Sequence, residues 1–210
     1  MIFNIFILHS IKKNNIYFIN YLLNLFLINS SNPIGDMDTK VHQISTQRLS
    51  LNHEKKRCIT ETYSGHTGPV NVIIHSKMPS QPNFHGLMLT GSFDWTIRLW
   101  NPKADEKCRM NFTYHDDEIT DLSFNPINPF MFSSCDSAGH FCVNSLYGDS
   151  EEPMFRFKMD GPLFNSKWDN SGRLVAMSDD SGGVHLKRFK AKFFEYKKDK
   201  LKNLERVIKK

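Results

Sequence analysis

The chain has 210 residues, of which 40% are hydrophobic and 12% aromatic, enough for one large or two small domains with a sizeable core. Its four cysteines contain no Cys-x-x-Cys pair, which excludes a zinc ribbon, argues against a disulfide framework and favours a reducing compartment. The net charge of +5 comes from residues 187–210, which hold 11 Lys/Arg against 3 Asp/Glu, so composition argues against a nucleic-acid footprint over the whole chain.

Residues 1–36 differ in composition from everything that follows. The first 33 residues contain no Gly, Ala, Val, Asp, Glu or Arg. The apolar run Ile16–Ile28 has 13 residues and includes two Asn, whereas a membrane span needs about 20 apolar residues. Two lysines precede it as in a signal peptide, but no small-residue cleavage site follows. We interpret residues 1–36 as a leader that is disordered, spurious or a weak hydrophobic anchor, with Met37 as an alternative start.

A repeat follows residues 37–56, which we interpret as a linker or the remnant of a preceding unit. Asp94 in SFDWTIRLW, Asp136 in SCDSAGHFCV and Asp179 in SDDSGGVHLKR are 42 and 43 residues apart. Each Asp follows a short apolar run and precedes an alternating one, which predicts a strand, a tight turn and a strand. A period of about 40–45 residues with four short strands predicts the blades of an all-β propeller.

Apolar alternation and turn signals place the strands of three units. We expect Val70–His75, Leu87–Gly91, Thr96–Trp100 and Lys107–Thr113 in the first unit, and Glu118–Phe124, Phe130–Ser134, Phe141–Leu146 and Pro153–Lys158 in the second. The third has Leu163–Trp168, Arg173–Met177 and Val184–Phe189, and Arg48–Tyr63 alternates enough to end a preceding blade.

The first unit resembles a WD40 repeat, through the Gly-His pair at 65–66, an Asp in the turn and a Trp that ends the third strand. In that family a His, a Ser or Thr, the turn Asp and the Trp form a hydrogen-bonded set with a structural role. The resemblance places this set at His66, Ser92 (or Thr90), Asp94 and Trp100.

The second and third units depart from this pattern. The second keeps a histidine, His115, but Tyr114 replaces the glycine and no Trp follows Asp136. The third keeps Asp179 but has no His before its first strand, and Lys187 stands near the Trp position. We therefore expect the hydrogen-bonded set to be partial in the second unit and absent in the third.

Read together, the units are similar to the C-terminal propeller of dynein intermediate chains over about residues 57–189. The motifs are GHTGPV, LTGSFDWTIRLWNPK, FNPINPFMFSSCDSAGHFCV and FNSKWDNSGRLVAMSDDSGGVHL. The cytoplasmic type is closer than the axonemal type through SFDWT and DSGGVHL, although the basic tail departs from it. The resemblance implies a non-catalytic scaffold without cofactor or metal, which docks on the dynein heavy chain beside other dynein subunits. It implies a location in the cytoplasm at the cytoskeleton, no nucleic-acid partner and no membrane span in the body of the protein.

Trp95 and the tail are the remaining features. In an ordinary WD40 turn the position of Trp95 is usually Gly and faces solvent, so we interpret this residue as a candidate interface anchor rather than a packing residue. Residues 190–210 read as a basic amphipathic α-helix that either packs on the last blade or meets an acidic partner. Three blades and a fragment cannot close a ring, so we expect the chain alone to aggregate or to unfold with poor cooperativity, and interpret it as a truncated gene model or a partial chain.

Sharper alternatives exist for several of these residues, and each has a simpler explanation. A zinc site would use Cys135, His140 and Cys142, but a fourth ligand is lacking and these residues fit a hairpin. An acid–base or metal cluster would use Asp116, Asp117 and Glu118, which fit a solvated loop. A hydrolase triad would use Ser64, His66 and Asp94, but the sequence has no nucleophile elbow. The alternative function is a generic WD40 adaptor in ubiquitin ligation, trafficking or RNA processing.

Overall fold

The structure is a computed structural model that describes residues 8–11, 16–19, 31–35, 39–45, 59–76, 84–128, 130–190, 193, 204 and 208. Before residue 39 it describes the backbone alone. The described elements are strands, and no helix in this part of the chain is long and apolar enough to cross a membrane.

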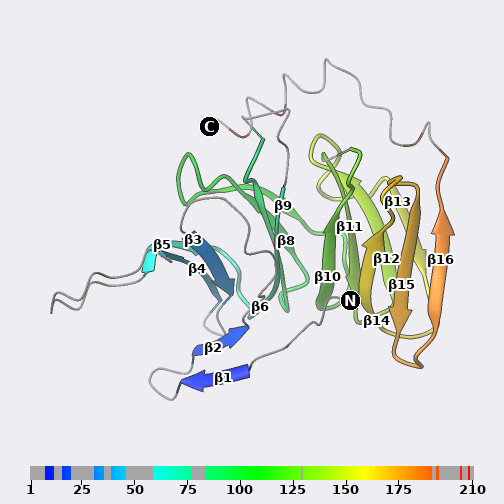
Figure 1. Ribbon diagram of the computed structural model, residues 1–210, viewed down its shortest axis with the longest axis horizontal. Helices are drawn as coiled ribbons and strands as arrows, with labels where there is room; N and C mark the ends of the chain where they lie inside the picture. The colour runs from blue at the N-terminus through cyan, green and yellow to red at the C-terminus, as the bar shows by residue number, and fades with distance from the viewer. Residues whose placement is uncertain are drawn as a thin grey trace, which may run out of the picture.

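Two four-stranded antiparallel sheets and one three-stranded sheet form successive blades (Figure 1). The first blade contains β6 (Val70–His75), β7 (Met88–Ser92), β8 (Ile97–Trp100) and β9 (Cys108–Phe112), and the second contains β10 (Ile119–Phe124), β11 (Met131–Asp136), β12 (His140–Ser145) and β13 (Phe155–Lys158). The third contains β14 (Leu163–Trp168), β15 (Leu174–Asp179) and β16 (Val184–Arg188). The strands predicted from apolar alternation are therefore confirmed, with boundaries that shift by two residues at most.

Two further sheets precede these blades. The strands β1 (Leu8–Ile11) and β2 (Ile16–Ile19) pair as a hairpin, and β3 (Ser31–Gly35), β4 (Lys40–Ser45) and β5 (Ile59–Ser64) form a three-stranded sheet. In this arrangement β3 lies within the segment that the sequence assigned to a leader, and β4 within the linker or remnant. The β3–β5 sheet packs on the first blade through Val41 and Tyr63.

The sheets stack face to face, because alternate residues of each strand bury opposite faces. In the first blade Leu89 and Leu99 belong to the core shared with the second blade, whereas Met88 and Trp100 pack towards the β3–β5 sheet. Both central strands of the second blade are buried along their whole length. This stacking confirms the prediction of an all-β propeller fragment.

Strand register corrects the equivalence of the three aspartates. Val70 pairs with Ser92, whereas the corresponding first residues of β10 and β14 pair with Asp136 and Asp179. Asp136 and Asp179 therefore occupy the position of Ser92, and Asp94 lies two residues further along, in the turn. The sequence alignment of the first two units was therefore wrong by two residues, because it matched Asp94, a turn residue, with aspartates that end a strand in the other two blades.

The predicted helix at 190–210 lies mostly outside the described residues. Leu204 and Ile208 within it are buried in the core between the first and second blades. The side-chain amide of Asn101 also donates to the carbonyl of Ile208 (3.2 Å). These two apolar residues therefore cover the first two blades and not the last, while Phe193 stacks on Phe189 of the third blade (5.3 Å between ring centroids).

Candidate functional site

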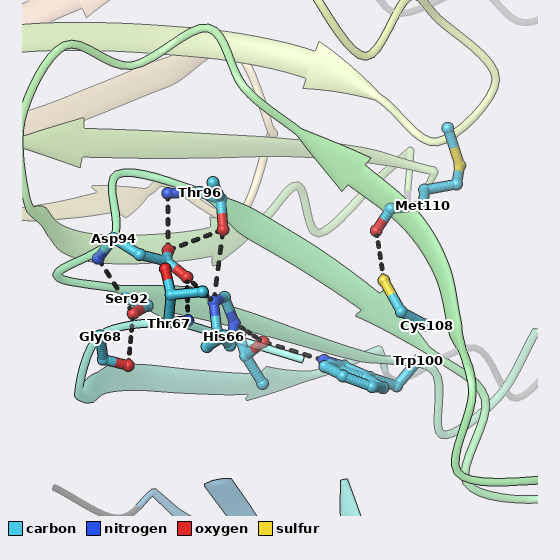
Figure 2. Close-up of polar contacts among 10 residues, drawn as sticks. His66, Thr67, Gly68, Ser92, Asp94, Thr96, Trp100, Cys108 and Met110 are labelled. Carbon is cyan, nitrogen blue, oxygen red and sulfur yellow. Dashed lines mark hydrogen bonds and ion pairs between the residues drawn. The ribbon is translucent and has the colours of Figure 1, made fainter. Parts of the chain in front are cut away.

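A buried chain of hydrogen bonds crosses the first blade (Figure 2). The indole N–H of Trp100 donates to Thr90 Oγ1 (2.9 Å), which also contacts His66 Nε2 (2.7 Å), and His66 Nδ1 contacts Asp94 Oδ2 (2.9 Å). An indole can only donate and a carboxylate can only accept, so a neutral His66 donates from Nδ1 and accepts the Thr90 proton at Nε2. The four polar groups thus satisfy one another inside the core.

The hydroxyl in this chain belongs to Thr90, and Ser92 lies outside it. Ser92 Oγ donates to the carbonyl of Gly68 (2.9 Å) and accepts from the backbone N–H of Asp94 (3.1 Å). Thr90 and Ser92 are two residues apart on β7 and share a face, but Thr90 is the one whose hydroxyl contacts the imidazole. Ser92 therefore fastens the turn to the segment that leads into β6.

Asp94 joins its own hairpin turn to the segment that precedes β6. One carboxylate oxygen accepts from His66 and from the backbone of Thr67 (2.8 Å), and the other accepts from the backbone N–H and hydroxyl of Thr96 (3.0 and 2.7 Å). Burial opposes ionisation, but these hydrogen bonds outweigh it and hold the pKa of Asp94 well below its usual range. The carboxylate is thus ionised and fully engaged at neutral pH.

The second blade builds a related chain from different residues. His115 Nδ1 contacts Asp136 Oδ2 (2.8 Å) and Nε2 contacts Ser134 Oγ (2.7 Å). No tryptophan is present, as the sequence indicated, but the hydroxyl of Tyr114 lies 3.4 Å from Ser134 Oγ. His140 Nδ1 adds a second imidazole to Asp136 (3.0 Å).

Gly65 explains why the two blades differ. A β-carbon on Gly65 would lie 2.6 Å from a guanidinium nitrogen of Arg98 and 3.2 Å from Cη2 of Trp100, so these two side chains crowd the position. In the second blade Asn144 stands at the strand position of Trp100, because it pairs with the residue equivalent to Met88. The asparagine in place of tryptophan leaves space in which the hydroxyl of Tyr114 approaches Ser134 of the hydrogen-bonded set. The comparison of the two units by sequence position missed this replacement.

The described residues of the third blade do not form a corresponding series of hydrogen bonds. Asp179 Oδ2 contacts His185 Nε2 (2.6 Å), but this histidine comes from β16 and not from the segment before the first strand. Its other oxygen accepts from Ser181 and from the backbone N–H of Gly183 (both 2.7 Å). Asp179 therefore caps its own hairpin.

The sharper chemical alternatives are not assembled. Both ring nitrogens of His66 are engaged by Thr90 and Asp94, and neither contacts Ser64. Burial raises the pKa of the Cys142 thiol to about 12 and that of Cys135 above its usual range, so both thiols are protonated at neutral pH. Across the part of the chain that the structure describes, no group of three His, Cys, Asp or Glu could hold a metal ion.

The stability of the chain should fall when the pH drops below about 6.5, the pKa of an unperturbed histidine. Burial of His115 lowers its pKa and outweighs the attraction of Asp136, so the unfolded state binds a proton that the folded state does not. Arg156 and His140 act in the same direction. The slope of unfolding free energy against pH between 6.5 and 5, from urea titrations, should be smaller in His115→Gln; an unchanged slope would contradict this assignment.

Trp95 occupies a turn position at which the other blades use glycine. It lies three residues after Ser92, as Gly139 and Gly182 lie three residues after Asp136 and Asp179. All three have positive φ: 66° for Trp95, 88° for Gly139 and 84° for Gly182. The indole is 51% exposed, and Phe93 beside it is 40% exposed. A left-handed backbone costs a side-chain-bearing residue about 1–2 kcal/mol, so the fold by itself favours glycine here.

Comparisons with known proteins agree with this geometry. The family model "WD domain, G-beta repeat" (WD40) matches residues 57–101 and 106–143. The chain is 32% identical over 136 residues to "Cytoplasmic dynein 1 intermediate chain" of Drosophila melanogaster, covering 64% of this chain and 20% of the relative. It is 31% identical over 126 residues to "Dynein axonemal intermediate chain 2" of Xenopus laevis, covering 60% and 20%. The chain spans about a fifth of the length of these curated relatives. Residues 57–101 and 106–143 therefore match WD40 repeats, and this region is similar to dynein intermediate chains, slightly more to the cytoplasmic than to the axonemal type.

Proposed function

We propose that this chain is a non-catalytic scaffold subunit of a dynein motor complex. Its propeller docks on the dynein heavy chain and supports microtubule-based movement in the cytoplasm. The observation that supports the proposal is the similarity of the WD40 region to two dynein intermediate chains. The first blade of this region contains the hydrogen bonds that connect Trp100, Thr90, His66 and Asp94. The hydrogen-bonding groups of these side chains are engaged within the blade, so we assign them a structural and not a catalytic role.

Co-purification tests the function. The tagged full chain, expressed in cells that contain dynein, should capture the heavy chain and other dynein subunits. Capture of a ubiquitin ligase, a trafficking coat or an RNA-processing complex without the heavy chain would instead assign the chain to generic WD40 adaptors. A variant such as His66→Ala, which breaks the buried chain, controls for capture by misfolded protein.

Trp95 is the proposed anchor of the docking surface. Its backbone is strained and its indole is half exposed, so its retention is better explained by a contact made outside the chain than by packing. Large aromatic side chains that expose their faces are the residues on which interface energy concentrates. The basic segment 190–210 remains a proposed contact for an acidic partner. Replacing its lysines with glutamine, which keeps the buried Leu204 and Ile208, should reduce salt-sensitive binding.

Replacing Trp95 with glycine should separate docking from folding. Relief of about 1–2 kcal/mol of strain, less about 0.5–1 kcal/mol for the extra freedom of glycine in the unfolded chain, leaves a gain in unfolding free energy of about 0–1.5 kcal/mol. Heavy-chain capture should fall at the same time. Urea unfolding and co-purification of Trp95→Gly and Trp95→Ala measure the two effects. If Trp95→Ala loses stability but keeps heavy-chain binding, the indole belongs to the fold.

A further inference from the structure

The turn that carries Trp95 lies on one end of the stacked sheets, here called the turn rim. The rim consists of the segments that precede the first strand of each blade and of the hairpin turns, which are residues 65–69, 93–96, 115–118, 137–139, 159–162 and 180–183. In each blade the hairpin turn bonds to the preceding segment: Phe93 N to Pro69 O (3.0 Å), Ser137 N to Glu118 O (3.0 Å) and Asp180 N to Pro162 O (3.2 Å).

The rim is continuous from one blade to the next. A β-carbon on Gly91, just before the Trp95 turn, would lie 2.5 Å from Cγ2 of Ile119, which begins the second blade. The side-chain amide of Asn71 donates to the carbonyl of Ile119 across the same boundary (2.9 Å). The loop 115–118 is therefore the neighbour of the turn that carries Phe93 and Trp95.

The charged residues within the rim segments are all acidic, although Arg98 lies against Gly65 and Arg156 pairs with Asp116 from neighbouring strands. The six segments contain six Asp or Glu residues and no Lys or Arg. Asp94 is engaged in the buried chain, but Asp160 and Asp180 are exposed, and the side chain of Asp116 is 65% exposed although it pairs with Arg156. The opposite end is mixed, since the loop 101–107 holds two lysines beside an Asp and a Glu.

Two described residues of the chain's basic tail, Leu204 and Ile208, lie away from this rim. Ile208 accepts a hydrogen bond from Asn101, which follows the end of β8 distant from the Trp95 turn. Leu204 and Ile208 are buried in the core and cannot also meet Trp95. These two residues are therefore not the occupant of the rim.

We propose that the turn rim binds a basic protein segment that lays an apolar side chain on Phe93 and Trp95. Lysine or arginine residues of this segment face the carboxylates of loop 115–118 and of Asp160 and Asp180. Opposite charge speeds and orients association, and the exposed indole face attracts a cation as well as an apolar group. The same carboxylates repel nucleic acid. The inference rests on the proposed function in that this segment would belong to the partner on which the propeller docks.

Two matched variants test the charge of the rim in the full chain. The rim variant carries Asp117→Asn, Glu118→Gln, Asp160→Asn and Asp180→Asn. The control variant carries Glu106→Gln, Asp149→Asn, Glu151→Gln and Glu152→Gln, which remove the same charge away from the rim. Heavy chain captured by the tagged protein is measured as salt concentration rises.

Capture by the parent should fall with salt, and the rim variant should bind about tenfold more weakly at low salt while the control variant matches the parent. Equal capture by the rim variant at every salt concentration overturns the inference but leaves the proposed function intact. Absence of heavy chain from the parent's capture overturns the proposed function instead.

A second measurement judges the rim independently of dynein. Fluorescence anisotropy of an amphipathic Lys/Leu peptide and of its Glu/Leu counterpart gives their affinities for the full chain. The Lys/Leu peptide should bind at least about tenfold more tightly, and both Trp95→Gly and the rim variant should remove this preference. Equal affinity of the two peptides, an unchanged preference in these variants, or stronger binding of an oligonucleotide than of the Lys/Leu peptide would overturn the inference.

Discussion

Replacing Trp100 with alanine should lower the free energy of unfolding by about 3–5 kcal/mol. The indole is completely buried, packs edge-on against Tyr63 with ring centroids 5.7 Å apart, and donates to Thr90. Its removal leaves a cavity between the β3–β5 sheet and the first blade and takes the donor from a buried hydroxyl. Urea unfolding of the full chain, followed by far-UV circular dichroism at low protein concentration, measures the loss.

Two controls apportion this effect. Trp100→Phe keeps much of the ring but removes the N–H, so it should cost about 1–3 kcal/mol. Trp95→Ala truncates an exposed tryptophan of the same hairpin and should change stability by about 0.5 kcal/mol or less. A loss below about 1 kcal/mol in Trp100→Ala would mean that the sheets are not packed as described.

Replacing Gly65 and Trp100 by the residues at the equivalent positions of the second blade, Tyr and Asn, should show strong coupling between the two substitutions in the free energy of unfolding. Gly65→Tyr alone overpacks the site and should cost about 1–3 kcal/mol, and Trp100→Asn alone should cost about 3–5 kcal/mol. Together they reproduce the pair Tyr114 and Asn144, in which the tyrosine fills the space and its hydroxyl reaches the chain. The double variant should therefore be about 1–3 kcal/mol more stable than the sum of the single losses predicts.

A control cycle shows whether this coupling is local. Gly65→Tyr combined with Val175→Ala, a buried change in the third blade, should be additive within about 0.5 kcal/mol. Both cycles use the same urea measurement. Additive losses for Gly65 and Trp100 would show that Tyr114 does not take over the role of the indole.

Strand alternation carried most of the fold prediction. β6 and β14 begin and end at the predicted residues, and both lie between clear turn signals. The Gly-His pair, the turn Asp and the Trp also pointed to one connected region, which the structure places at the first blade. Local periodicity and turn chemistry suffice for these features since they depend on neighbours in sequence.

Pairing register decided what alternation could not. Two hydroxyls on one face of β7 are equivalent in the sequence, and the structure places Thr90 in the hydrogen-bonded set and Ser92 against the segment before β6. The same register shows that Asp136 corresponds to Ser92 and not to Asp94.

The sequence by itself determined an all-β stack of blades with WD40 repeats, the histidine, aspartate and tryptophan of the first blade's polar set, and the unusual tryptophan in its turn. The tertiary structure decided that Tyr114 replaces an absent indole, that the tail residues Leu204 and Ile208 cover the first two blades, and that Trp95 holds a backbone conformation reserved for glycine in its neighbours. The physical reason is that strand period and turn type are local properties, whereas space freed by one side chain, contacts made by a distant segment and strain imposed by a hairpin exist only after the sheets have packed.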